Sequence, residues 1–133
     1  MGQGGADYNP MVIIDIETTG PDPDMHEVCY FYAIPLSPTF EISAVNTPVL
    51  MAIKPEIMAT MPSYLTNSAI IKEAIVTGLP VHKAQEGLEN WLRGFNVDRK
   101  IVPICWNYRA KESFLRQLLT DDIYNDFIST HVS

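Results

Sequence analysis

The sequence predicts a single α/β domain on a mixed β-sheet, in which three antiparallel strands come first and helix, strand and helix follow. Apolar, β-branched and aromatic runs fill the early part of the chain. A clear amphipathic helical pattern comes next, and a short apolar run separates it from a second helical pattern. The observations that predict this fold class lie at 11–16, 26–36, 49–53, 81–95 and 101–106.

Three candidate strands open the domain. The first, 11–16, reads M-V-I-I-D-I and resembles a central strand buried on both faces. A turn rich in Gly, Pro and Asp covers 17–25, and the second strand at 26–36 is dense in aromatic and β-branched residues. Segments 40–44 and 49–53 are shorter candidates for a third strand and its continuation. Consecutive strands of this kind favour an antiparallel meander.

The later elements are mainly helical. Segment 54–65 is interrupted by prolines and predicts irregular structure, and 68–76 predicts a short helix. At 81–95, apolar residues recur every three or four positions, which predicts the clearest helix. The strand at 101–106 contains Pro103, which favours a strand start or a sheet edge. Two further helices are predicted at 112–119 and 121–128.

Length and composition fit one globular domain. The chain has 133 residues, 47% of them hydrophobic, and no stretch approaches the length of a membrane-spanning helix. Residues 1–10 are polar and Gly-rich, so we interpret them as a flexible arm or the remnant of an appended tag, with the domain at 11–133. Cys29 and Cys105 lie in apolar surroundings, which favours reduced thiols and a cytoplasmic location.

The charge of the chain excludes one class of nucleic-acid-binding protein. A net charge of −7 argues against a basic, sequence-independent DNA coat, although a protein that recruits metal cations to neutralise phosphate stays compatible with it. Six of the nine basic residues fall within 93–116. That segment is either a phosphate-contacting surface or a solvated helix face balanced by acids.

Two acids at the end of the first strand are the main functional signal. Side chains two positions apart in a strand point to the same face, so Asp15 and Glu17 project side by side. Adjacent carboxylates repel each other and lose hydration, and a shared divalent cation offsets that cost. Solvated acids at a strand end are the alternative. The apolar strand before them and the Thr-Thr-Gly-Pro turn after them favour a metal-dependent site.

The hexapeptide D-I-E-T-T-G at 15–20 resembles the first motif of the DnaQ-like (DEDD) 3′–5′ exonucleases, members of the ribonuclease H-like superfamily. The resemblance implies a ribonuclease H-like mixed sheet whose fourth strand runs parallel to the first. It also implies two Mg²⁺ or Mn²⁺ ions, bridged by Asp15, with Glu17 on one of them. Thr18 and Thr19 would contact the 3′-terminal nucleotide, although plain turn chemistry explains them equally well.

The second motif of this family is only partly matched. The chain reads W-N-Y-R-A-K-E-S-F-L, in which Asn107 matches the family's Asn, and Phe114 with Leu115 matches its hydrophobic pair. Lys111 stands where the metal-binding Asp belongs, and a protonated lysine cannot ligate a cation. Either Glu112 turns in as a substitute ligand, or Lys111 itself pairs with Asp15 or Glu17 and the site has lost a metal ligand.

The third motif, a general base and a final Asp on a downstream helix, has no match at the expected spacing. Segment 121–133 holds acids and a histidine, but too close to the second motif. We therefore expect an exonuclease-like domain at 11–133 that lacks its C-terminal helix. It is either a fragment of a longer polypeptide or a shortened relative.

Two functions follow from the resemblance. One is a 3′–5′ exonuclease domain that cleaves DNA or RNA by a two-metal-ion mechanism and releases nucleoside monophosphates. The other is a catalytically impaired nuclease-fold module that acts as a regulatory domain or as a domain that binds nucleic acid or protein. The implied partner is the 3′ end of a single strand, with no membrane, and a homodimer or a larger replication, repair or RNA-processing assembly stays open.

Overall fold

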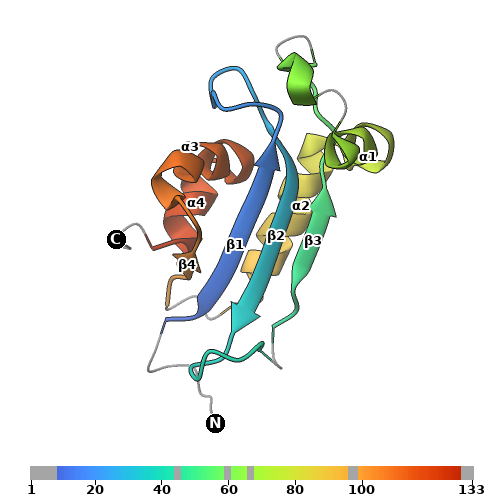
Figure 1. Ribbon diagram of the computed structural model, residues 1–133. Coiled ribbons are helices and arrows are strands. Elements are labelled where there is room, and N and C mark those ends of the chain that lie inside the picture. Colours follow the sequence, from blue (N-terminus) through green and yellow to red (C-terminus); the bar gives the residue numbers. More distant parts are fainter. Residues whose placement is uncertain (1–8, 44–45, 59–60, 66–67, 96–98, 130–133) are drawn as a thin grey trace.

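The computed structural model describes residues 9–43, 46–58, 61–65, 68–95 and 99–129 (Figure 1). Most of the predicted arm at 1–10 lies outside the described residues. Four strands form one sheet in the order β3-β2-β1-β4. The strands are β1 (Met11–Thr18), β2 (Val28–Leu36), β3 (Val49–Ala52) and β4 (Val102–Ile104).

The sheet has the predicted mixed topology. β1 pairs antiparallel with β2 along its whole length, and β2 pairs antiparallel with β3. β4 returns beside β1 and runs parallel to it, but pairs only with its first three residues, Met11, Val12 and Ile13. The chain reaches β4 from β3 through α1 and α2, a helical connection of the kind that commonly precedes a strand in parallel pairing. This arrangement confirms the fold class that the sequence predicts.

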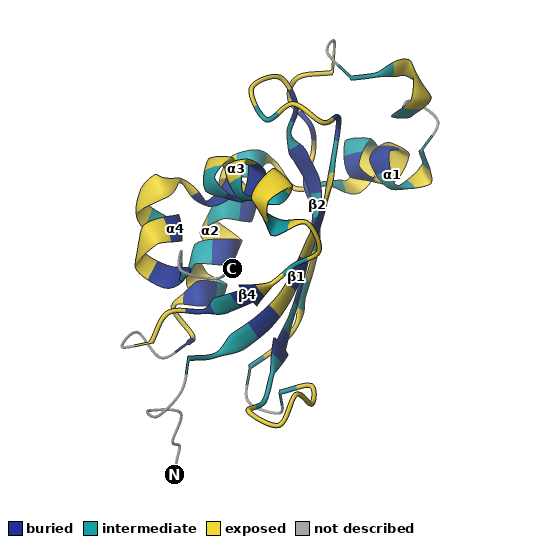
Figure 2. Cartoon of the chain, turned by 60° about the vertical axis from the view of Figure 1, so that its left-hand side comes forward, coloured by how far each residue is buried: buried dark blue, intermediate teal, exposed yellow. Residues whose placement is uncertain are grey.

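Three of the helices cover one face of the sheet. Figure 2 shows α2, α3 and α4 together on one side, and α1 beyond the opposite side near one end. Among the described residues, no helix combines the length and the apolar character needed to cross a bilayer. The helices are α1 (Ala69–Thr77), α2 (Val81–Leu92), α3 (Tyr108–Leu119) and α4 (Asp121–Phe127), with a 3₁₀ turn at Ser63–Leu65.

The burial of β1 alternates strictly. Val12, Ile14 and Ile16 are buried beneath the helices, while Ile13, Asp15 and Glu17 are exposed. The prediction that this strand is buried on both faces is therefore wrong for the described residues. The physical reason is that helices α2 to α4 all pack on the same side, so only every second residue enters the core.

Several element boundaries differ from the predictions, among them the end of α2 at Leu92 and not at 95. β1 continues to Thr18, so Glu17 belongs to the strand and not to the turn. The candidate strand at 40–44 is absent where it is described: Phe40 has a φ of 65°, and Ile42 makes only an isolated bridge to Leu36. Residues 44–45 lie outside the described residues. α3 begins at Tyr108, four residues before the predicted start at 112.

Candidate active site

The acid pair lies on the exposed face of the sheet, past the end of β4. Since β4 pairs with β1 only as far as Ile13, both Asp15 and Glu17 extend beyond the paired region. β1 and β4 are parallel, and their carboxyl ends therefore meet at the same edge, which is where α/β sheets commonly bind ligands. Asp15 and Glu17 point away from the helical layer and are both exposed.

A β-bulge adjusts the backbone at Glu17. Glu17 faces Tyr30 and Thr18 faces Val28, so Cys29 is an extra residue in β2. The Cys29 thiol donates a hydrogen bond to the Glu17 carbonyl at 3.4 Å, and this bond links the two strands at the bulge. Burial, and then the Glu17 charge, raise the pKa of Cys29 to about 12, so this thiol stays protonated. Bulges of this kind re-aim side chains beside functional sites.

Lys111 contacts the acid pair directly. Its ammonium Nζ lies 2.7 Å from Oδ1 of Asp15, and the same oxygen accepts a hydrogen bond from the Ile16 N–H at 2.9 Å. The Lys111 side chain is 23% exposed and that of Asp15 is 53% exposed. The sequence was compatible with Glu112 as a substitute metal ligand or with Lys111 paired with an acid. The geometry agrees with the second arrangement.

Glu112 points elsewhere. Its Oε2 accepts a hydrogen bond from the Tyr124 hydroxyl at 3.1 Å and lies 3.7 Å from the Arg116 guanidinium. The first contact joins α3 to α4, and the second lies within α3. Adjacent residues on a helix are separated by about 100°, so Lys111 and Glu112 cannot both face the acid pair. The alternative in which Glu112 serves as a substitute ligand does not agree with this geometry.

The turn after β1 is held by its own hydrogen bonds. The Thr18 hydroxyl donates to the Gly20 carbonyl at 2.7 Å. Thr19 is fully buried, and its hydroxyl accepts from the Glu27 N–H at 3.0 Å. His26 is also buried, and its Nδ1 accepts from the Asp22 N–H at 3.0 Å. Thr18 thus stays at the surface, while Thr19 is occupied in maintaining the turn.

Asn107 begins α3 at the same edge of the sheet. It adopts a left-handed conformation with φ 55° and ψ 50°, which asparagine tolerates better than most residues. It is exposed, and its side chain makes no capping bond to the helix. The reversal at Asn107 turns the chain from β4 into α3, which carries Lys111 back toward β1.

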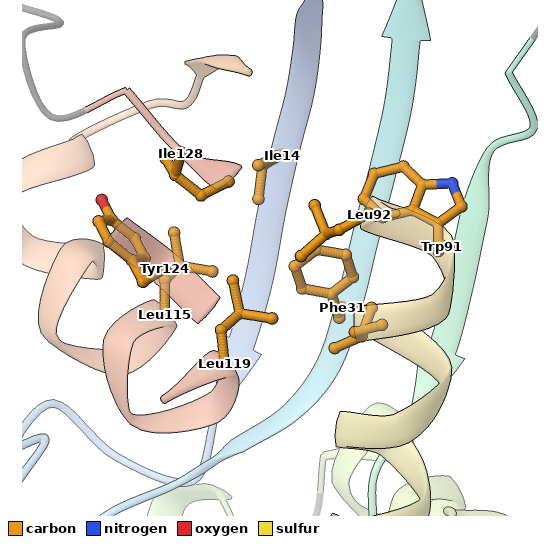
Figure 3. Close-up of a pocket in the computed structure, with 9 residues that line it drawn as sticks. Ile14, Phe31, Trp91, Leu92, Leu115, Leu119, Tyr124 and Ile128 are labelled. Atoms are coloured by element: carbon orange, nitrogen blue, oxygen red, sulfur yellow. The ribbon is translucent and has the colours of Figure 1, made fainter. Parts of the chain in front are cut away.

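An open hollow lies beside these residues, between the end of β1, its following turn, the 3₁₀ turn and α3. It is lined by Glu17, Thr18, Gly20, Tyr64, Lys111 and Phe114, among others. A second, more enclosed gap lies between α2 on one side and α3 with α4 on the other, above β1 and β2 (Figure 3). The surface that lines it is apolar, so we interpret it as a packing gap within the core and not as a catalytic site.

The donor set limits what metal this region could hold. Among the residues that the structure describes, no group of three or more His, Cys, Asp or Glu is arranged to bind a metal ion. Asp15 and Glu17 are two oxygen donors on one face, and Lys111 already contacts the first. These residues fit part of the ligand set of one divalent cation and do not fit a pair of ions.

The chain matches a family model and several solved structures. The model of the RNase T family, described as an exonuclease, covers residues 12–123. E. coli exonuclease I in complex with a dT13 oligonucleotide superposes with a TM-score of 0.66 and 17% identity, over 93% of this chain and 25% of that chain. Exonuclease I from Methylocaldum szegediense gives a TM-score of 0.62 and 17% identity, over 84% of this chain and 23% of that one.

A third structure, E. coli exonuclease I with a dA16 oligonucleotide, gives a TM-score of 0.67 at 18% identity, over 90% of this chain and 26% of that chain. This chain therefore spans about a quarter of the length of the solved chains it matches. No curated protein matches it. The family model and the shared fold together identify this chain as a member of the RNase T exonuclease family with a DnaQ-like exonuclease fold.

Proposed function

We propose that this chain is a nuclease domain of the 3′–5′ exonuclease type that acts at the 3′ end of single-stranded DNA or RNA. The observation that carries the proposal is the position of Asp15 and Glu17, side by side at the carboxyl end of β1, with Glu17 lining an open hollow. Membership of the exonuclease family supports it. The oligonucleotides in the exonuclease I complexes support a single-stranded substrate.

Asp15 and Glu17 would hold a divalent cation, Mg²⁺ or Mn²⁺. Such an ion lowers the pKa of a bound water and stabilises the departing 3′ oxygen, and nucleoside monophosphates would be the products. Among the described residues, no third carboxylate joins Asp15 and Glu17 in a group that could hold a metal ion. We therefore propose that hydrolysis by this chain is slow, because the two-ion arrangement of the family is incomplete.

Other residues would position the nucleic acid. Thr18 retains lone pairs on a hydroxyl that borders the hollow, and Asn107 has an exposed amide at the same edge of the sheet. We propose that both contact the terminal nucleotide. Thr19 would act indirectly, since its buried hydroxyl holds the turn that carries Thr18.

The test is degradation of a 3′-labelled single-stranded oligonucleotide in Mn²⁺, with DNA and RNA substrates in parallel. The wild-type chain should release labelled mononucleotide, and Asp15→Ala should reduce the rate by at least about a hundredfold. Glu86→Gln is a matched control, because Glu86 is an exposed acid on α2 that pairs only loosely with Lys83 at 4.0 Å. No degradation by the wild type, or equal rates for wild type and Asp15→Ala, would refute the exonuclease proposal.

The Lys111–Asp15 ion pair favours a second candidate function, a nuclease-fold module that binds a single strand without cutting it. In that case, the chain should bind a single-stranded oligonucleotide in EDTA, measured by fluorescence anisotropy, and leave it intact in Mn²⁺. Degradation that Asp15→Ala abolishes would exclude this candidate.

A further inference from the structure

The contact between Lys111 and Asp15 joins two parts of the chain that are 96 residues apart in sequence. At 2.7 Å it has the length of a strong, charge-assisted hydrogen bond. Both Lys111 and Glu17 also line the same hollow. The Lys111 ammonium therefore lies where a bound divalent cation would balance the negative charges of Asp15 and Glu17.

An ammonium at this position has two electrostatic effects. It lowers the repulsion between the carboxylates of Asp15 and Glu17, because a positive charge lies against one of them. It also repels any divalent ion that approaches the same oxygen, and three-quarters of the Lys111 side chain is shielded from the solvent that would screen that repulsion.

Glu112 offers no compensating carboxylate, since it contacts Tyr124 and Arg116. A divalent ion would thus have to displace Lys111 to reach Asp15, and would then find two acid ligands among the described residues.

We propose that Lys111 is an internal cation that occupies the place of the divalent ion at Asp15, so that the acid pair is stable without metal and binds metal weakly. This inference rests on the proposed function only in identifying Asp15 and Glu17 as the nuclease acids. It makes the identity of residue 111 the main determinant of the affinity of this site for divalent cations.

The experiment measures Mn²⁺ binding to the purified chain without nucleic acid, by calorimetry and by the electron paramagnetic resonance signal of free Mn²⁺. Lys111→Gln removes the charge and should tighten Mn²⁺ binding about tenfold; Lys111→Asp also adds a carboxylate and should tighten it about a hundredfold. Lys83→Gln is the matched control, since it removes a lysine from an exposed ion pair on α2 and should bind Mn²⁺ as the wild type does.

Thermal unfolding gives a second measurement. In EDTA, Lys111→Asp should unfold at a lower temperature than the wild type, because three carboxylates then repel one another, and Mn²⁺ should restore the loss. The wild type should change little when Mn²⁺ is added. If Lys111→Asp does not fold without metal, Lys111→Gln still tests the proposal through its Mn²⁺ affinity.

Equal Mn²⁺ affinities for the wild type, Lys111→Gln and Lys83→Gln would overturn the proposal, as would tight binding by the wild type. These outcomes concern metal binding alone. Failure of the proposed function would instead appear as an absence of oligonucleotide degradation, so the two failures are distinguishable.

Discussion

At the scale of single residues, a close approach between Gly20 and His26 shapes the turn beside the acid pair. Gly20 is buried, and a Cβ added to it would lie 2.5 Å from carbon Cδ2 of the His26 ring. The ring cannot easily move away, because it is buried and its Nδ1 accepts a hydrogen bond from Asp22. Only glycine fits at position 20, which explains the final residue of the D-I-E-T-T-G motif by packing.

Gly20→Ala should therefore destabilise the chain by about 1–3 kcal/mol, because overpacking forces the turn or the ring to shift. Gly87→Ala is the matched control. Gly87 is an exposed residue within α2, its added Cβ would lie 3.4 Å from Met51 Cε, and alanine favours a helix over glycine by about 1 kcal/mol. Urea unfolding measures both variants. Equal stability of Gly20→Ala and the wild type would show that the turn can relax.

At the scale of elements, α3 determines which groups reach the acid pair. Lys111 extends toward β1, while Glu112 joins α3 to α4 through Tyr124. Gln117 on the same helix donates from Nε2 to the Pro23 carbonyl at 2.8 Å, which ties α3 to the turn after β1. A rotation of α3 would disturb the Lys111–Asp15 and Gln117–Pro23 contacts together. The rotational position of this helix therefore determines which of its side chains reach Asp15.

Glu112→Ala should lower the free energy of unfolding by about 1 kcal/mol, because the Tyr124 hydroxyl loses its acceptor. Tyr124→Phe should cost a similar amount, and the double variant should cost less than the sum of the two. Mn²⁺ affinity should be unchanged in Glu112→Ala. A large loss of Mn²⁺ binding would instead show that Glu112 serves as a metal ligand.

At the scale of the whole molecule, half of the basic residues in the segment 93–116 are paired with acids. Three of its six basic residues form ion pairs within the fold: Arg93 with Glu89 at 2.6 Å, Lys111 with Asp15 at 2.7 Å, and Arg116 with Asp121 at 3.4 Å. These contacts agree with the interpretation of a helix surface balanced by acids. A net charge of −7 further limits the attraction for phosphate.

The affinity for a single strand should therefore depend only weakly on salt. Among the residues that the structure describes, three basic residues of this segment have no acid partner. The slope of log K against log salt should therefore be no steeper than about −2, because each phosphate contact on a single strand contributes about −0.7. Fluorescence anisotropy at several NaCl concentrations measures it. A much steeper slope would mean that basic side chains outside this segment also contact the phosphates.

The sequence alone determined the features that depend on local patterns. Side chains two positions apart lie on the same face of a strand, so the sequence predicted that Asp15 and Glu17 project together. The helical period of the apolar residues predicted α2 to within a few residues. Strand order and the helical crossover predicted the mixed sheet. The resemblance to the second exonuclease motif also implied that Lys111 stands where the family has its metal-binding Asp, and this stays a prediction.

Only the tertiary structure decided what these residues contact. β4 ends at Ile104, which leaves the end of β1 open for α3, and this brings Lys111 rather than Glu112 to Asp15. The exposure of one face of β1 arises because α2, α3 and α4 pack on the other face, and the residue pattern of the strand itself does not show where those helices lie. Such outcomes depend on contacts between distant segments, whose geometry is set by packing and not by the sequence near either residue.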